Sequence, residues 1–150
     1  MRFDRFGLAF EHPDNWMIDT EDSEGRFATV TVYSPRGGFW SVSGHAAGGD
    51  PGELAAAVVS EMREEYRELD VEAATDEFAG RSLAGCDLNF YCLDLTNTAQ
   101  VRTLATSTAI YLILCQAEDR EWDELAPVFA AITTSFVTGL DGSGGKAAAR

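Results

Sequence analysis

Apolar side chains recur along the chain at two spacings, and the change of spacing separates predicted strands from predicted helices. In the first third, short runs of apolar, β-branched and aromatic residues are bounded by turn residues, which is typical of strands. The predicted strands lie at 8–10, 16–18, 27–33 and 39–45. Pro35-Arg36-Gly37-Gly38 is a strong turn signal, so we expect the last two strands to form a hairpin. A polar, charged loop is predicted at 21–25.

The clearest helix prediction begins at Asp50. Asp50 is a good N-cap, Pro51 suits the first helical position, and Glu53 falls three residues after the cap. An apolar stripe follows at helical spacing and consists of Leu54, Val58, Met62, Tyr66 and Leu69. Acidic residues lie away from this stripe, which indicates a solvated opposite face.

The second half of the chain begins with a predicted strand at 71–78, followed by three more at about 86–96, 99–106 and 109–118. Tight turns at Thr96-Asn97 and Ser107-Thr108 would make these three an antiparallel meander. Both faces of the meander are apolar, because side chains alternate along a strand and Leu88 and Tyr91 point to opposite sides. A sheet with one wet face would alternate with polar residues, so we expect helices on both sides.

A second helix is predicted from about Asp119 to Phe136. Its apolar face consists of Trp122, Leu125, Phe129, Ile132 and Phe136. Pro127 would remove a backbone hydrogen bond from the interior of a helix. We therefore predict a short first turn that ends near Ala126 and a main helix that starts around Pro127, with a kinked helix as the alternative.

These elements predict one α+β domain over residues 1–138. Its antiparallel sheet has about six or seven strands, arranged as hairpins and then a meander, and carries one helix on each face as an α/β/α sandwich. The remaining residues, 139–150, are rich in glycine and alanine and have the composition of a flexible C-terminal tail.

The net charge narrows the choice of partners. The chain has 25 acidic and 11 basic residues, which gives a formal charge of −14. Such a surface repels phosphate backbones and anionic membranes, so neither nucleic-acid binding nor membrane association is expected, whereas a basic protein surface would be attracted. No stretch approaches the roughly 20 apolar residues that cross a bilayer, so no membrane insertion is expected.

Few residues offer catalytic or metal-binding chemistry. Three cysteines without C-x-x-C spacing argue against a disulfide framework or a zinc site and favour reduced thiols in the cytoplasm. His12 and His45 are the only histidines and lack metal-ligand spacing. Arg102 is expected to form a cross-strand ion pair with Asp87 or Asp94 rather than to clamp a substrate. We expect no enzyme activity, metal or cofactor.

Several short motifs resemble those of a known family. They are Gly7-Leu8-Ala9-Phe10 followed by Pro13 and Trp16, Gly80 with Leu83-Ala84-Gly85, and Pro127, Phe129, Ile132, Ser135 and Phe136. In these positions and in its order of elements the chain resembles the PsbP-like superfamily of small α/β/α sandwiches, which includes PsbP, DcrB-like lipoproteins, LpqN and a Ran-binding factor. The resemblance implies a binding or accessory role rather than catalysis.

The predicted hairpin tip carries the candidate interface residues, Arg36 and Trp40, since exposed arginine and tryptophan are typical interface anchors. The alternative is that Trp40 packs inward under the first helix. We predict a non-enzymatic module that binds another protein through a face of its sheet or through this tip. The alternative function is a small-ligand-binding protein with a pocket between sheet and helix. That pocket could be lined by Tyr33, Tyr66, Tyr91 and Tyr111.

Overall fold

The computed structural model describes residues 1–20 and 28–149, and the predicted polar loop at 21–25 lies outside them. The elements in chain order are β1 (Arg2–Arg5), β2 (Leu8–Glu11), β3 (Met17–Asp19), β4 (Thr29–Tyr33), β5 (Phe39–Ala46), α1 (Pro51–Glu65), β6 (Asp70–Phe78), β7 (Arg81–Cys92), β8 (Leu95–Ala105), β9 (Ala109–Glu118) and α2 (Asp119–Ala149).

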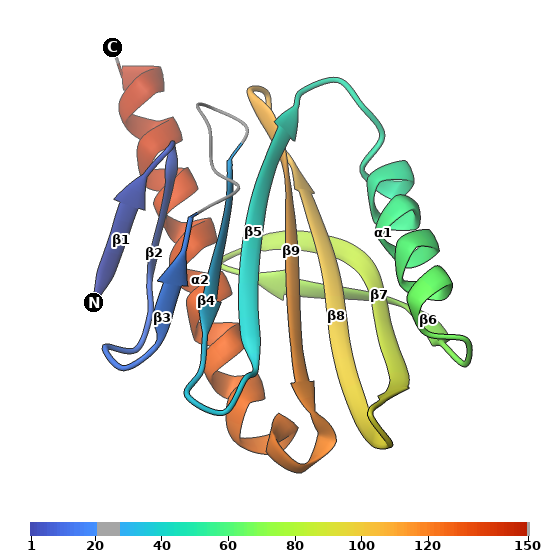
Figure 1. Ribbon diagram of the computed structural model, residues 1–150. Coiled ribbons are helices and arrows are strands. Elements are labelled where there is room, and N and C mark those ends of the chain that lie inside the picture. The colour runs from blue at the N-terminus through green and yellow to red at the C-terminus, as the bar shows by residue number, and fades with distance from the viewer. Residues whose placement is uncertain (21–27, 150) are drawn as a thin grey trace.

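Seven of the described strands form one antiparallel sheet in the order β3-β4-β5-β9-β8-β7-β6. β1 and β2 form a separate two-stranded ribbon beside it. The two helices lie on opposite sides of the large sheet, α1 in front of it and α2 behind it in the view of Figure 1. The predicted α+β class, with an antiparallel sheet between two helices, is therefore confirmed.

Each face of the sheet has its own hydrophobic core, which is why the middle strands are apolar on both sides. The larger core lies between the sheet, α2 and the β1–β2 ribbon, and its largest fully buried side chains include Trp40, Phe10 and Phe136. The second core lies between α1 and β7, β8 and β9, and includes Met62, Leu88 and Val101.

Both helices differ in detail from their predicted bounds. The side chain of Asp50 caps α1 by accepting the Gly52 N–H at 2.8 Å, as predicted, but the helix ends at Glu65 because Tyr66 is extended. α2 runs through Pro127 without the predicted break, and its first turns lie at an angle to the rest in Figure 1, which favours the kinked alternative. It also continues past Phe136 to Ala149, so the predicted end was too early.

One turn and two strand pairings complete the comparison with the prediction. The β7–β8 turn lies at Leu93-Asp94, not at Thr96-Asn97 as predicted, and both turn residues have positive φ angles of 53° and 64°. β1 was not predicted, and it pairs with β2. β3 pairs with β4, which extends the large sheet by one edge strand.

Candidate functional site

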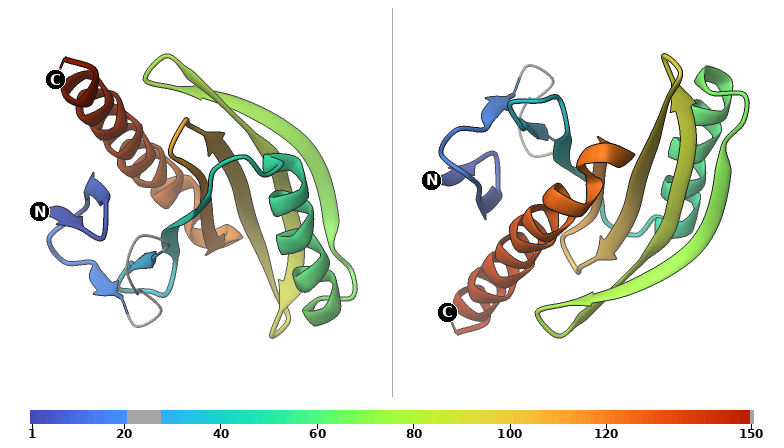
Figure 2. Two further views of the ribbon diagram at one scale, coloured as in Figure 1. Left: turned by 90° about the horizontal axis from the view of Figure 1, so that it is seen from above. Right: turned by 90° about the horizontal axis from the view of Figure 1, so that it is seen from below.

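α1 covers only part of its face of the sheet. It packs on β7, β8 and β9, and Figures 1 and 2 show it over that side of the molecule with no helix in front of β3, β4 and β5. We call the α1-facing side of β3, β4 and β5 the uncovered face.

The alternation of β5 explains the character of this face. Trp40 and Val42 point into the core under α2, so Phe39, Ser41 and Ser43 point to the opposite side. The face is therefore mostly hydroxyl-bearing, although Ser41 is itself buried and its Oγ donates to the Leu114 carbonyl at 3.4 Å. His45 also projects from it and lies 2.8 Å from Ser43 Oγ through Nε2, and partial burial lowers the pKa of the imidazole.

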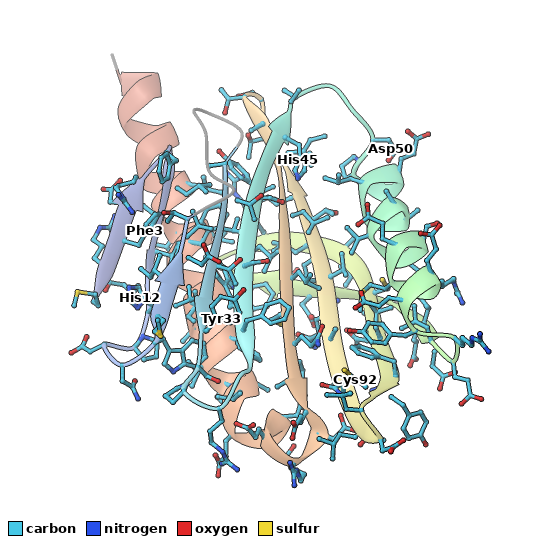
Figure 3. All side chains as sticks on the ribbon, viewed as in Figure 1. Phe3, His12, Tyr33, His45, Asp50 and Cys92 are labelled. Atoms are coloured by element: carbon cyan, nitrogen blue, oxygen red, sulfur yellow. The ribbon has the colours of Figure 1, made fainter. Side chains whose placement is uncertain are left out.

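An apolar row crosses the uncovered face beside the β4–β5 turn. Met17 is paired directly with Tyr33, and Tyr33 with Phe39, so the three side chains are neighbours across three strands. The rings of Tyr33 and Phe39 lie 6.0 Å apart, and Met17 and Tyr33 are 75% and 39% exposed. Figure 3 shows Tyr33 on β4 with no helix in front of it. The prediction missed Met17, although its opposite alternation to Trp16 could have indicated it.

The two residues predicted for the hairpin tip do not lie together. Arg36 is at the turn, its side chain is 68% exposed, and its Nε lies 3.7 Å from Glu121 Oε2. Trp40 is fully buried, and its indole Nε1 donates to Thr133 Oγ1 at 2.9 Å. The prediction of Trp40 as a surface anchor is therefore wrong, because β5 directs it into the larger core. It does pack inward, but under α2 and not under the first helix.

The four tyrosines do not line a shared pocket. Tyr66 stacks on Phe90 at 4.3 Å, and burial, followed by the charge of Glu65, raises the pKa of its hydroxyl. Tyr111 packs against Phe136 on the far side of the sheet, where burial also raises its pKa. Tyr91 is 60% exposed beside a polar hollow of about 670 Å³ at the β7–β8 end.

A pocket between sheet and helix does exist, but it lies between α1 and β6, β7 and β8 and has a volume of about 750 Å³. We call it the α1 groove. Its lining consists of Asp50, Pro51, Gly52, Ala55, Ala56, Val59, Ser60, Arg63, Val71, Ala84, Gly85, Cys86 and Thr103. Small side chains rather than tyrosines therefore form it.

Arg102 forms the predicted cross-strand ion pair with Asp87, at 2.7 Å, and a second pair with Asp76 that the sequence did not indicate. Asp94 is not involved, since it lies in the β7–β8 turn. The guanidinium donates to both carboxylates and to the carbonyls of Cys86 and Val101. Burial alone lowers the pKa of Arg102, but Asp87 and Asp76 outweigh it and the pKa is raised. With its five N–H groups engaged, Arg102 holds strands together and has none left for a substrate.

The described histidines and carboxylates do not converge on a metal site. Within residues 1–20 and 28–149, no group of three or more His, Cys, Asp or Glu side chains could hold a metal ion. His12 is a buried loop residue whose Nδ1 donates to the Pro13 carbonyl. Figure 3 shows it far from His45. The part of the chain that the structure describes contains no helix long and apolar enough to cross a membrane.

Comparison with known proteins supports the fold. No family model and no curated protein matches the chain. The solution structure of cyanobacterial PsbP (CyanoP) from Synechocystis sp. PCC 6803 matches with a TM-score of 0.61 at 13% identity, over 90% of this chain and 89% of that one. A crystal structure from Bacteroides thetaiotaomicron VPI-5482 matches with a TM-score of 0.57 at 14% identity, over 87% of this chain and 46% of that one.

A third match is PA94 from Pseudomonas aeruginosa, a protein of unknown function described as a putative regulator, with a TM-score of 0.51 at 10% identity over 90% of this chain and 94% of that one. At such low identities the matches establish shared architecture only. The resemblance predicted from the short motifs is thereby confirmed at the level of architecture, and the chain has the PsbP-like fold.

Proposed function

We propose that this protein is a non-enzymatic module that binds another protein through the apolar row on its uncovered face, with Arg36 at the edge of the contact. The observation that carries the proposal is the position of Met17, Tyr33 and Phe39 as direct cross-strand neighbours where no described helix covers the sheet. Single exposed apolar residues are normal on protein surfaces, whereas contiguous ones mark interaction sites.

The chemistry of the row suits a protein interface. Methionine adapts its shape to a partner, and tyrosine combines a large apolar ring with a hydroxyl that can donate a hydrogen bond. The hydroxyl-bearing strands around the row would form the polar rim that surrounds the apolar centre of an interface. Arg36 reaches Glu121 at only 3.7 Å and is largely exposed, so it can turn toward a carboxylate of the partner.

The net charge of −14 indicates the kind of partner. We expect a partner with an apolar pocket surrounded by basic residues. Its basic residues would be attracted to the acidic surface at long range, and its pocket would hold the apolar row at short range. The likeness in fold to CyanoP is consistent with this proposal, because the resemblance to the PsbP-like superfamily implies binding and accessory roles.

Photo-crosslinking from two positions tests the proposal. A photoreactive phenylalanine analogue replaces Tyr33 in one variant and Tyr91, which is exposed on the other hairpin, in a matched control. We expect a discrete crosslinked protein from position 33 in the host extract and not from position 91. Purified, that partner should bind the wild type and should bind a Met17→Ser/Tyr33→Ser variant at least about tenfold more weakly. Equal binding by both proteins would refute the proposal.

A further inference from the structure

The α1 groove is a second site, and its shape follows from the size of the residues that line it. α1 turns its larger apolar side chains, Leu54, Val58 and Met62, toward the core over β8 and β9. The adjacent strip of the helix, which faces β6 and β7, carries mainly small residues. Gly52, Ala55, Ala56 and Ser60 are small, and Val59 is the largest apolar side chain among them.

The strands opposite this strip carry small residues as well. Ala84, Gly85 and Cys86 of β7 form the floor, and Gly85 has no room for a side chain because a Cβ would collide with the backbone of Val101. Alanine and glycine on both walls cannot fill the space between a helix and a sheet. A groove of about 750 Å³ remains, within the roughly 300–1,000 Å³ typical of small-molecule sites.

The groove has an apolar interior and one unpaired cation. Arg63 stands at the C-terminal end of α1 and forms no ion pair with any residue that the structure describes, unlike Arg36, Arg102 and Arg120. Asp50 at the other end keeps its negative charge while its carboxylate caps the helix, so it would repel an anionic group there and favour its binding at the Arg63 end. Arg63 and Gly52 are eleven residues apart, which is about 16 Å along a helix at 1.5 Å per residue. The groove is therefore long enough for an extended aliphatic chain.

We infer that the α1 groove binds a monocarboxylate with an aliphatic chain, whose carboxylate pairs with Arg63 and whose chain lies along Ala56, Val59, Ala84 and Cys86. The apolar walls suit the chain, and the guanidinium fork suits a carboxylate. The complementary charge decides the class of ligand, because Arg63 is the cation of the lining and lacks a described partner inside the protein. This site is separate from the uncovered face and does not depend on the proposed protein contact.

Calorimetry with decanoate, below its micelle-forming concentration, tests the inference on the full chain. We expect saturable binding of one decanoate, and about tenfold weaker binding to Arg63→Gln, the loss expected for one charge-assisted hydrogen bond. Arg67→Gln is the matched control, since Arg67 lies beyond the end of α1 and outside the groove. Decyltrimethylammonium, which has the same chain and the opposite charge, should not bind measurably.

Two filling variants locate the site. Ala56 and Ala84 are exposed in the empty groove, so Ala56→Leu and Ala84→Leu should fold and should abolish saturable binding. In a Cys92→Ser background, decanoate should slow the alkylation of Cys86 several-fold. The inference is overturned if decanoate does not bind, if both filling variants bind it as the wild type does, or if Arg67→Gln weakens binding as much as Arg63→Gln. Retained decanoate binding by Met17→Ser/Tyr33→Ser would show that the two sites are independent.

Discussion

Substitution of Gly85 by alanine should be among the most destabilising small changes in this protein. A Cβ at this position would collide with the carbonyl group of Val101 on the neighbouring strand and would lie 3.2 Å from the Cα of Arg102. Backbone atoms cannot rotate away as a flexible side chain can, so β7 and β8 would have to separate locally. This separation would also stretch the hydrogen bonds that Arg102 Nη1 donates to the carbonyls of Cys86 and Val101, which are 3.0 Å each.

The expected cost can be worked from these contacts. Overpacking of a tightly packed interior costs about 1–3 kcal/mol, and a weakened buried hydrogen bond adds about 1 kcal/mol. We therefore expect Gly85→Ala to lower the free energy of unfolding by about 2–4 kcal/mol, from a total of about 5–15 kcal/mol for a domain. Urea unfolding followed by circular dichroism would measure the change, provided that the slope with urea stays constant.

Gly49→Ala is the matched control. A Cβ there would meet Ile110 Cδ1 at 3.5 Å, an ordinary van der Waals contact, and should change the stability by less than about 0.5 kcal/mol. If Gly85→Ala were as mild as this control, the close approach of β7 and β8 would not exist in solution. The explanation for the small residues on the floor of the α1 groove would then be wrong as well.

Asp50→Ala removes the carboxylate that accepts the Gly52 N–H, and should cost about 1 kcal/mol, seen as a lower midpoint of thermal unfolding; an unchanged midpoint would argue against the cap. Burial lowers the pKa of His45 in the folded protein, so below pH 6.5 the unfolded chain binds a proton more readily. As the pH is lowered below 6.5, the free energy of unfolding should therefore fall more steeply in the wild type than in His45→Gln. Parallel profiles of unfolding free energy against pH would contradict this. Burial raises the pKa of Cys115 to about 12, so labelling of the Cys115 thiol at neutral pH should be slow. Most of the rapid labelling of the protein should come from the partly exposed Cys92 and should be lost in Cys92→Ser. Rapid modification of Cys115 would show that its strand opens.

The sequence predicted the sheet and its two helices because those features depend on local patterns. The cap at Asp50 and the apolar periodicity of both helices follow from neighbouring residues alone. The β7–β8 turn was misplaced because Leu93 and Asp94 adopt positive φ angles, for which asparagine and glycine are the usual signals. Leu93 is apolar, and from the sequence it continues the run of strand residues before it, although in the structure it is 91% exposed at the turn.

The candidate sites were harder to predict, because they depend on which face of each strand is covered. Alternation shows that Phe39 and Trp40 point to opposite sides, but both are aromatic, and only the pairing of β5 with β9 places Trp40 under α2. The lining of the α1 groove gives no local signal either. Alanines at 55 and 56 are ordinary helix formers, and their small size matters only because Ala84 and Gly85 lie opposite them.

Both proposed sites follow from one feature of the topology. The chain leaves β5 in the interior of the sheet and enters β6 at its far edge, so α1 has to cross over β9, β8 and β7 on the way. α1 runs roughly along these strands in Figure 1, and a helix is only about 10–12 Å wide, or two to three strand spacings, so it cannot also cover β3, β4 and β5. The same crossover places the small-residue strip of α1 beside β6 and β7, where the α1 groove opens. Because α1 connects β5 to β6, the apolar row is exposed beyond one side of α1 and the α1 groove opens along its other side.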